Sequence, residues 1–147
     1  MNLQDLQKLE TVEERAAQAF AASRDCVTAL NVDIIPNLHP RERTGPKRLI
    51  SAIENRRIFE QDIITELDVL IEKLSRRILN GSEKIEQFIA DECHTDGGGT
   101  VTHHHQTFEA EALARALPFL IELKEALLDV HDLMHAIRAV DKLRQRI

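Results

Sequence analysis

The feature that most constrains this chain is a heptad repeat of apolar residues that runs from about Thr107 to the C-terminus. Two positions in each heptad carry the repeat. One holds Leu113, Leu120, Leu127 and Met134, and the other holds Leu123, Val130 and Ile137. A period of 3.5 residues places both positions along one side of an α-helix and favours left-handed packing against another helix. The sequence therefore predicts a long C-terminal helix that is packed along its length.

A further apolar stripe flanks this repeat and widens the face of the same helix. It contains Phe119, Ala126, Leu133 and Val140. We expect the widened face to accept a partner helix, as amphipathic helices do in hydrophobic grooves. The residues expected at this partner-helix seam are Phe119, Leu123, Leu127, Val130, Leu133, Met134, Ile137 and Val140.

Apolar residues at steps of three and four predict two more long helices, at about Leu3–Ile35 and Pro46–Leu79. Pro36 ends the first, because proline has no amide proton and disfavours helix in the residue before it. Asn80-Gly81 is expected to form a left-handed C-cap for the second. A short helix at about Glu83–Cys93 should follow.

Composition supports an all-α fold. Aromatic residues make up 3% of the 147 residues, with five Phe and no Trp or Tyr, so aliphatic side chains must fill the core. We expect a single domain over residues 1–147: an elongated antiparallel bundle with coiled-coil-like packing, three long helices and one short one. Because bundles of this kind often complete their core by dimerising, a homodimer is expected.

Charge, hydropathy and cysteine content indicate a cytoplasmic protein. The formal net charge of −6 repels nucleic acid and anionic membranes. No stretch approaches the roughly 18 consecutive apolar residues that a membrane-spanning helix needs, and the N-terminus does not resemble a secretory signal. Cys26 and Cys93 are expected to be reduced thiols.

Cysteine and histidine residues gather around the glycine-rich segment Thr95–Thr100. Cys93 and His94 precede it, and His103, His104 and His105 follow it. Thiolate and imidazole are ligands that zinc and other transition metals prefer. A metal-binding sensor or enzyme using these residues is therefore an alternative hypothesis, with zinc as its cofactor, although the spacing matches no standard zinc motif.

The tripeptide His131-Asp132-Leu133 resembles the phospho-accepting box of sensor histidine kinases and related phosphotransfer bundles. The resemblance implies a bundle helix on which His131 accepts the phosphoryl group while its acidic neighbour acts as a base. It covers three residues. Ala136 and Ile137 stand in the region where that family usually has a proline, so the chain departs from the family pattern there.

A basic segment lies between residues 41 and 57. It contains Arg41, Arg43, Lys47, Arg48, Arg56 and Arg57, with only Glu42 and Glu54 as acids. Such a cluster at a helix start is suited to phosphate groups or an acidic partner. Nucleic-acid binding is thus possible but not favoured, since Phe59 is the one aromatic residue nearby for base stacking.

The chain shows no spacing typical of a catalytic triad or a phosphate-binding loop, and no catalytic residue is assigned. We expect a non-enzymatic protein-interaction module: an adaptor, a chaperone-like protein or a regulatory bundle. It needs no cofactor, and its partner is another protein.

Overall fold

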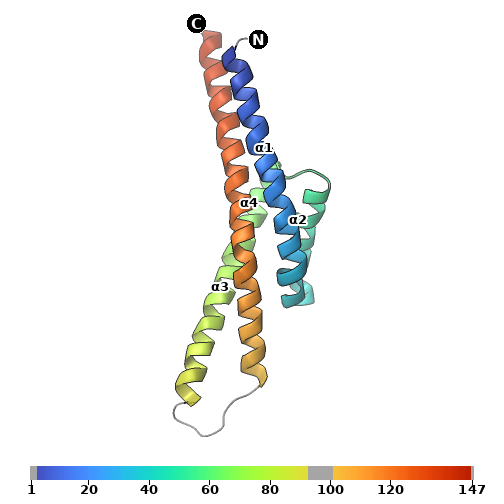
Figure 1. Ribbon diagram of the computed structural model, residues 1–147, viewed down its shortest axis with the longest axis vertical. Helices are drawn as coiled ribbons and strands as arrows, with labels where there is room; N and C mark the ends of the chain where they lie inside the picture. The colour runs from blue at the N-terminus through green and yellow to red at the C-terminus, as the bar shows by residue number, and fades with distance from the viewer. Residues whose placement is uncertain (1–2, 93–100, 147) are drawn as a thin grey trace.

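The computed structural model describes residues 3–92 and 101–146, which form helices and turns with no strand. Four helices follow one another along the chain: α1 (Leu3–Ala29), α2 (Thr44–Glu54), α3 (Gln61–Glu92) and α4 (Val101–Arg146). They pack against each other as an elongated bundle (Figure 1). The prediction of an all-α bundle is confirmed.

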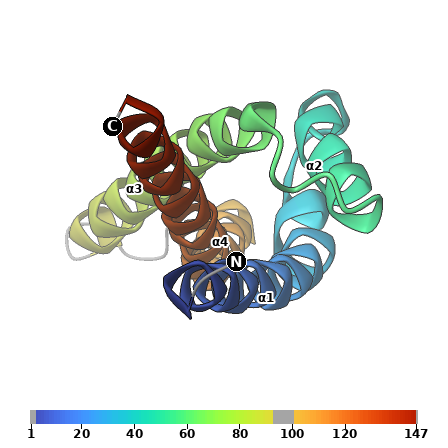
Figure 2. The ribbon, with the colours of Figure 1, turned by 90° about the horizontal axis from the view of Figure 1, so that it is seen from above.

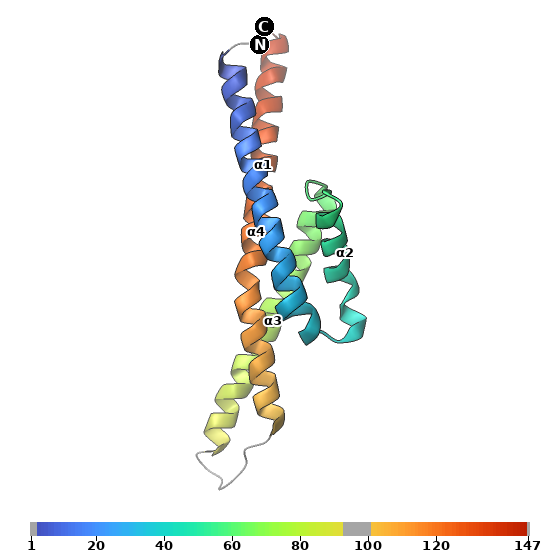
Figure 3. The ribbon, with the colours of Figure 1, turned by 45° about the vertical axis from the view of Figure 1, so that its right-hand side comes forward.

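Helix α4 is the spine of the bundle. Its 46 residues extend about 69 Å at 1.5 Å per residue, and it contacts α3 over one half and α1 over the other. Short α2 packs against α3 and α1 near the middle of the molecule and lies to one side of α4 (Figure 2). Beyond α2, the first half of α1 and the last half of α4 continue alone to the two termini (Figure 3).

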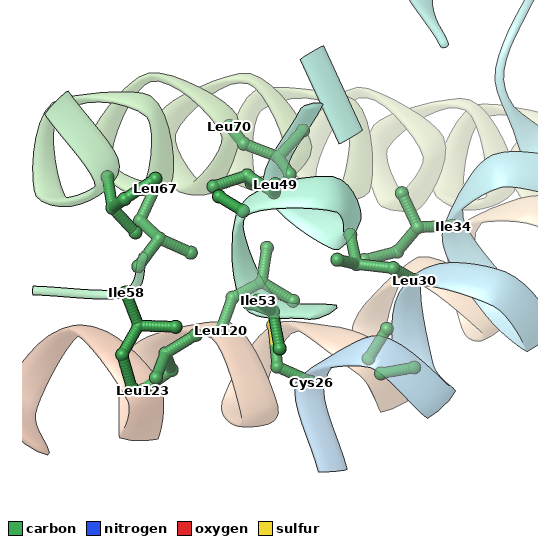
Figure 4. Packing of buried hydrophobic residues seen from close by; sticks show 14 of the residues in the cluster. Cys26, Leu30, Ile34, Leu49, Ile53, Ile58, Leu67, Leu70, Leu120 and Leu123 are labelled. Atoms are coloured by element: carbon green, nitrogen blue, oxygen red, sulfur yellow. The ribbon is translucent and has the colours of Figure 1, made fainter. Parts of the chain in front are cut away.

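The core lies where the helices overlap (Figure 4). Leu113, Leu120, Leu123 and Leu127 of α4 are at most 1% exposed, so these four apolar positions of the heptad repeat are buried, as predicted. They meet buried residues of every other helix: Cys26, Leu30 and Ile34 near the end of α1, Leu49 and Ile53 of α2, and Ile58, Leu67 and Leu74 around α3.

The first helix ends near Pro36, as predicted, but through a widened turn. Residues Leu30–Ile34 form a π-helical turn in which the amide of Ile35 donates to the carbonyl of Leu30. A short 3-10 turn over Ile35–Asn37 follows. Proline cannot donate an amide hydrogen bond, and its ring crowds the preceding turn. The α-helix therefore gives way to a wider turn and then a tighter turn around Pro36, as is common at helix ends.

The prediction of one helix over Pro46–Leu79 was wrong, because the chain breaks after Glu54. The amide of Arg57 donates to Ala52 O (2.8 Å) and that of Arg56 donates to Ile53 O (3.1 Å). These two bonds are the pattern of a Schellman C-cap, in which the first residue beyond the C-cap takes a left-handed conformation. Arg56 supplies it, with φ of 57°. Glycine usually fills this position, so its absence hid the break.

Replacing Arg56 with glycine should therefore stabilise the fold. A left-handed conformation costs a non-glycine residue roughly 1–2 kcal/mol, and glycine removes most of this strain. We expect Arg56→Gly to raise the free energy of unfolding by about 1 kcal/mol in urea titrations. Arg57→Gly is the control, and it should be neutral or destabilising, because Arg57 is not left-handed.

The predicted helix end at Asn80-Gly81 was also wrong. Helix α3 runs without interruption through Gly81 to Glu92, so no separate helix starts near Glu83. The glycine serves helix packing instead. A Cβ atom at position 81 would lie 2.8 Å from the Cβ of Ala110, closer than such atoms approach. Glycine here lets α3 and α4 come together.

This close approach predicts opposite effects for two glycine-to-alanine substitutions. Alanine favours helix over glycine by about 1 kcal/mol, so Gly45→Ala in α2, where nothing lies within 4 Å of the new Cβ, should be neutral or stabilising. Gly81→Ala should destabilise despite the same gain, because α3 and α4 must separate. Thermal denaturation of both variants tests this, and equal stabilisation would contradict it.

Helix α4 begins at Val101, earlier than the predicted start near Thr107. It also continues through Pro118, which lies on its exposed side. The amide that Pro118 lacks would have bonded to Ala114 four residues earlier. Since this side faces solvent, water can satisfy the free carbonyl, and the helix is not ended.

Candidate protein interface

A groove opens where the bundle thins from four helices to two. Its volume is about 620 Å³, and it lies between the first half of α1, the turn before α3 and the last part of α4. We call it the terminal groove. It is lined by the apolar residues Val12, Ala16, Phe59, Val130 and Met134, and by the polar residues His131, Asp132, His135 and Arg138.

The groove exists because the layer that covers α1 and α4 stops at Phe59. Ile58 is fully buried, and the ring of Phe59 packs edge-on against Phe20 of α1, with centroids 5.4 Å apart and planes at 88°. These contacts fix the turn before α3 at this level. Further along α4, Val130 is still 7% exposed, whereas Met134, one heptad after Leu127, is only partly buried.

The rim of the terminal groove carries cationic and imidazole groups on one helix face. His131, His135 and Arg138 lie three or four residues apart on α4, with Asp132 beside them. Arg138 is exposed, and among the described residues it forms no ion pair. An apolar floor with Arg138 at its rim is suited to an amphipathic segment that presents apolar side chains and a carboxylate.

Two other grooves lie between the helices. One of about 660 Å³ lies between α1 and α2, and most of its lining is polar or charged, including Arg24, Glu54 and Arg56. Another of about 420 Å³ lies between the start of α2 and α3, where charged residues alternate with Leu49 and Leu70. Neither continues an apolar seam of the core, as the terminal groove does.

The structure separates the predicted basic segment into two groups. Arg41 and Arg43 lie before α2, whereas Arg56 and Arg57 follow its end, 11 helical residues or about 16 Å away. Several members are already bonded within the chain. Arg43 Nε donates to Leu38 O (3.1 Å), and Arg48 Nε lies 3.3 Å from Glu66 Oε1. Lys47 is exposed.

Glu42 joins this region to α3. Its carboxylate lies 2.6 Å from Lys73 Nζ and 2.8 Å from an Arg77 nitrogen, and it is 21% exposed. The hydrogen bond from Lys73, with the charges of Lys73 and Arg77, lowers the pKa of Glu42 against the opposing effect of burial. The ion pairs therefore fasten the segment before α2 onto α3.

The lowered pKa of Glu42 predicts a contribution to acid sensitivity. A carboxyl whose folded pKa lies below its ordinary value of 4.5 stabilises the fold above that pH, and the contribution disappears as pH falls through the folded pKa. Glu42→Gln should lower stability at neutral pH and flatten the fall in stability below pH 4.5. Urea titrations at several pH values test this, with Glu72→Gln, on an exposed ion pair, as the control.

The predicted metal ligands lie largely outside the described residues. Cys93 and His94 are not described, and of His103, His104 and His105 only the backbone is, as part of the first turns of α4. Among described side chains, no three His, Cys, Asp or Glu residues are grouped as metal ligands would be. Metal binding by these residues stays a prediction.

His131, the predicted phospho-acceptor, is partly buried beside the terminal groove. Its Nε2 atom is enclosed and has no hydrogen-bond partner among the described residues. A phosphoryl donor needs an accessible ring nitrogen, which Nε2 does not offer as placed.

Cys26 is fully buried and free, and burial raises its pKa to about 12, so its thiol is protonated at neutral pH.

The predicted partner-helix seam is divided by the fold. Leu123 and Leu127 are 0% exposed, so this chain's own helices already cover them. Val130 and Met134 line the terminal groove, while Ile137 is partly buried on the same seam. Phe119 and Val140 are 39% and 37% exposed, and Leu133 is partly exposed. Apart from Leu123 and Leu127, the seam is therefore still open to a partner.

Sequence reasoning missed the contribution of Val12, Ala16 and Phe59 to the groove. Val12 and Ala16 belong to the apolar stripe of the first predicted helix, and that stripe was the available signal. The position of Phe59 depends on the break after Glu54 and the left-handed turn at Arg56, which the sequence pattern did not reveal.

Comparison with known proteins gave no relative. No protein-family model, no curated protein and no solved structure matched the chain. None of the helices, over the residues described, combines the length and apolar character that crossing a bilayer requires.

Proposed function

We propose that this protein is an interaction module that binds another protein through the terminal groove. The observation that carries the proposal is an apolar groove of about 620 Å³ at the point where the bundle thins to two helices. The partner would be an amphipathic segment whose apolar side chains cover Val12, Ala16 and Met134. A carboxylate on that segment would pair with Arg138.

Burial of apolar surface would favour binding of a partner at this groove. Met134 lies one heptad beyond buried Leu127 and is only partly buried. Covering such residues removes apolar surface from water, which stabilises the complex by about 25 cal/mol for each Å² that is buried. Arg138, which has no ion pair within the described chain, adds orientation more than affinity. An adaptor, chaperone-like or regulatory role in the cytoplasm is consistent with this mode of binding.

Two neighbouring alanines allow a matched test. Ala16 lines the groove and is partly buried, whereas Ala17 is exposed and does not line it. Ala16→Arg places a long cationic side chain in the groove and should abolish capture of groove-dependent partners. Ala17→Arg adds the same charge one residue away and should leave capture intact. The measurement is affinity capture from cell extract with quantitative mass spectrometry.

Two further measurements make the comparison specific. Circular dichroism should show equal helix content for both variants, which separates a blocked groove from an unfolded protein. Arg138→Glu should weaken the same partners that Ala16→Arg removes, because it reverses the charge of the rim. If the captured proteins are identical for all four forms, the terminal groove is not a binding site and the proposal fails.

A further inference from the structure

A second apolar stripe runs along α4 beyond the level at which α2 ends and α3 begins (Figure 3). Leu133, Ala136, Val140 and Leu143 are spaced by three, four and three residues, the pattern of one side of a coiled-coil helix. We call these residues the α4 stripe. Leu143 is 61% exposed and Val140 is 37% exposed, Ala136 is exposed and Leu133 is partly exposed.

The α4 stripe and the terminal groove lie on opposite sides of the helix. Successive residues are about 100° apart around an α-helix. His131 and Arg138 of the groove therefore point away from Val140 and Leu143 of the stripe. Helix α1 packs between them, on the seam that contains Met134 and Ile137. The stripe is thus a separate surface.

Charged residues mark both ends of the stripe. Continuing its spacing toward the N-terminus reaches Asp129, which interrupts the apolar pattern. Asp132 and Arg146 flank the two ends of the stripe on the same edge of the helix. Neither forms an ion pair within the described chain. Because one end is acidic and the other end is basic, the stripe is complementary to the same stripe of a second copy that runs in the opposite direction.

We propose that the α4 stripe is the interface of an antiparallel homodimer. Turning a second copy end over end places Leu133 opposite the partner's Leu143 and Ala136 opposite the partner's Val140. In this register Asp132 lies beside the partner's Arg146, and two-fold symmetry forms the pair twice. The contact uses the same patch on both copies, so it closes at two chains.

The antiparallel arrangement is favoured over the parallel one by these charges. In a parallel pair, Asp132 would lie beside the partner's Ile137, because the two flanking edges of parallel helices face each other out of register, so the pair between Asp132 and Arg146 would not form. It would also bring together two basic helix ends that contain Arg138 and Lys142. Both arrangements match apolar residues with each other, but the reversed pairing also sets opposite charges together at both ends of the stripe.

The length of the stripe sets the strength of the dimer. From residue 131 to residue 146, α4 spans about 24 Å, which is short for a two-helix interface. Stable dimers bury roughly 800 Å² per partner, and a single stripe of this length buries less. We expect a reversible dimer with a dissociation constant in the micromolar range.

Sedimentation velocity of the purified full chain over a range of concentrations tests the interface. The wild-type protein should shift from monomer to dimer as concentration rises. Leu143→Gln should weaken the dimer at least about tenfold. Leu79→Gln is a close control, because Leu79 is 60% exposed on α3, and its dimer should match the wild type. A monomer at all concentrations up to about 1 mM would overturn the proposal, as would a Leu143→Gln dimer of unchanged strength.

Charge reversal tests the register. Asp132→Arg and Arg146→Glu should each weaken the dimer, because each sets like charges together, and the double variant should recover most of the lost affinity. Failure of the double variant to recover, with helix content unchanged, would overturn the antiparallel register. These readouts concern dimer mass alone, and Leu143 and Arg146 do not line the terminal groove, so their variants separate failure of the dimer from loss of partner capture.

Discussion

Burial of one side of α4 holds the whole structure together. Its seam residues Leu113, Leu120, Leu123 and Leu127 are almost completely removed from water by α3 over one half and by α1 over the other. Fully burying one leucine is worth about 1.5–3 kcal/mol. Because no single partner helix covers the full length of α4, the bundle is offset, and each end consists of only two helices (Figure 3). The available surfaces follow from this offset.

The sequence predicted the elements whose signal is periodic and missed those that depend on one backbone conformation. Heptad spacing identified the buried positions of α4, since period alone decides which side of a helix faces the core. The break after Glu54 was not predicted, because Arg56 takes a left-handed conformation in which glycine is expected. Gly81 gave the reverse error: it resembles a helix end, but its function is to let Ala110 approach.

The candidate interface could be predicted only in part for a related reason. The apolar face of α4 is visible in the sequence, but the level at which other helices stop covering it is not. That level is set by Phe59, whose position depends on the turn at Arg56 and on the contact with Phe20. Leu127 and Met134 occupy equivalent heptad positions, yet the first is core and the second lines the terminal groove. Tertiary context alone distinguishes them.

The two surfaces at the end of the bundle have different physical requirements. The terminal groove is concave and has Arg138 at its rim, so it selects a partner by shape and by a carboxylate. The α4 stripe is convex and apolar, with opposite charges at its ends, so a reversed copy of itself is its best match. If both surfaces are occupied, the dimer presents two grooves on one particle. Two linked grooves would bind a partner with repeated segments more tightly than one groove does, since the second contact forms within the same complex. A weak dimer would then respond to its partner, because binding at both grooves stabilises the paired state by mass action.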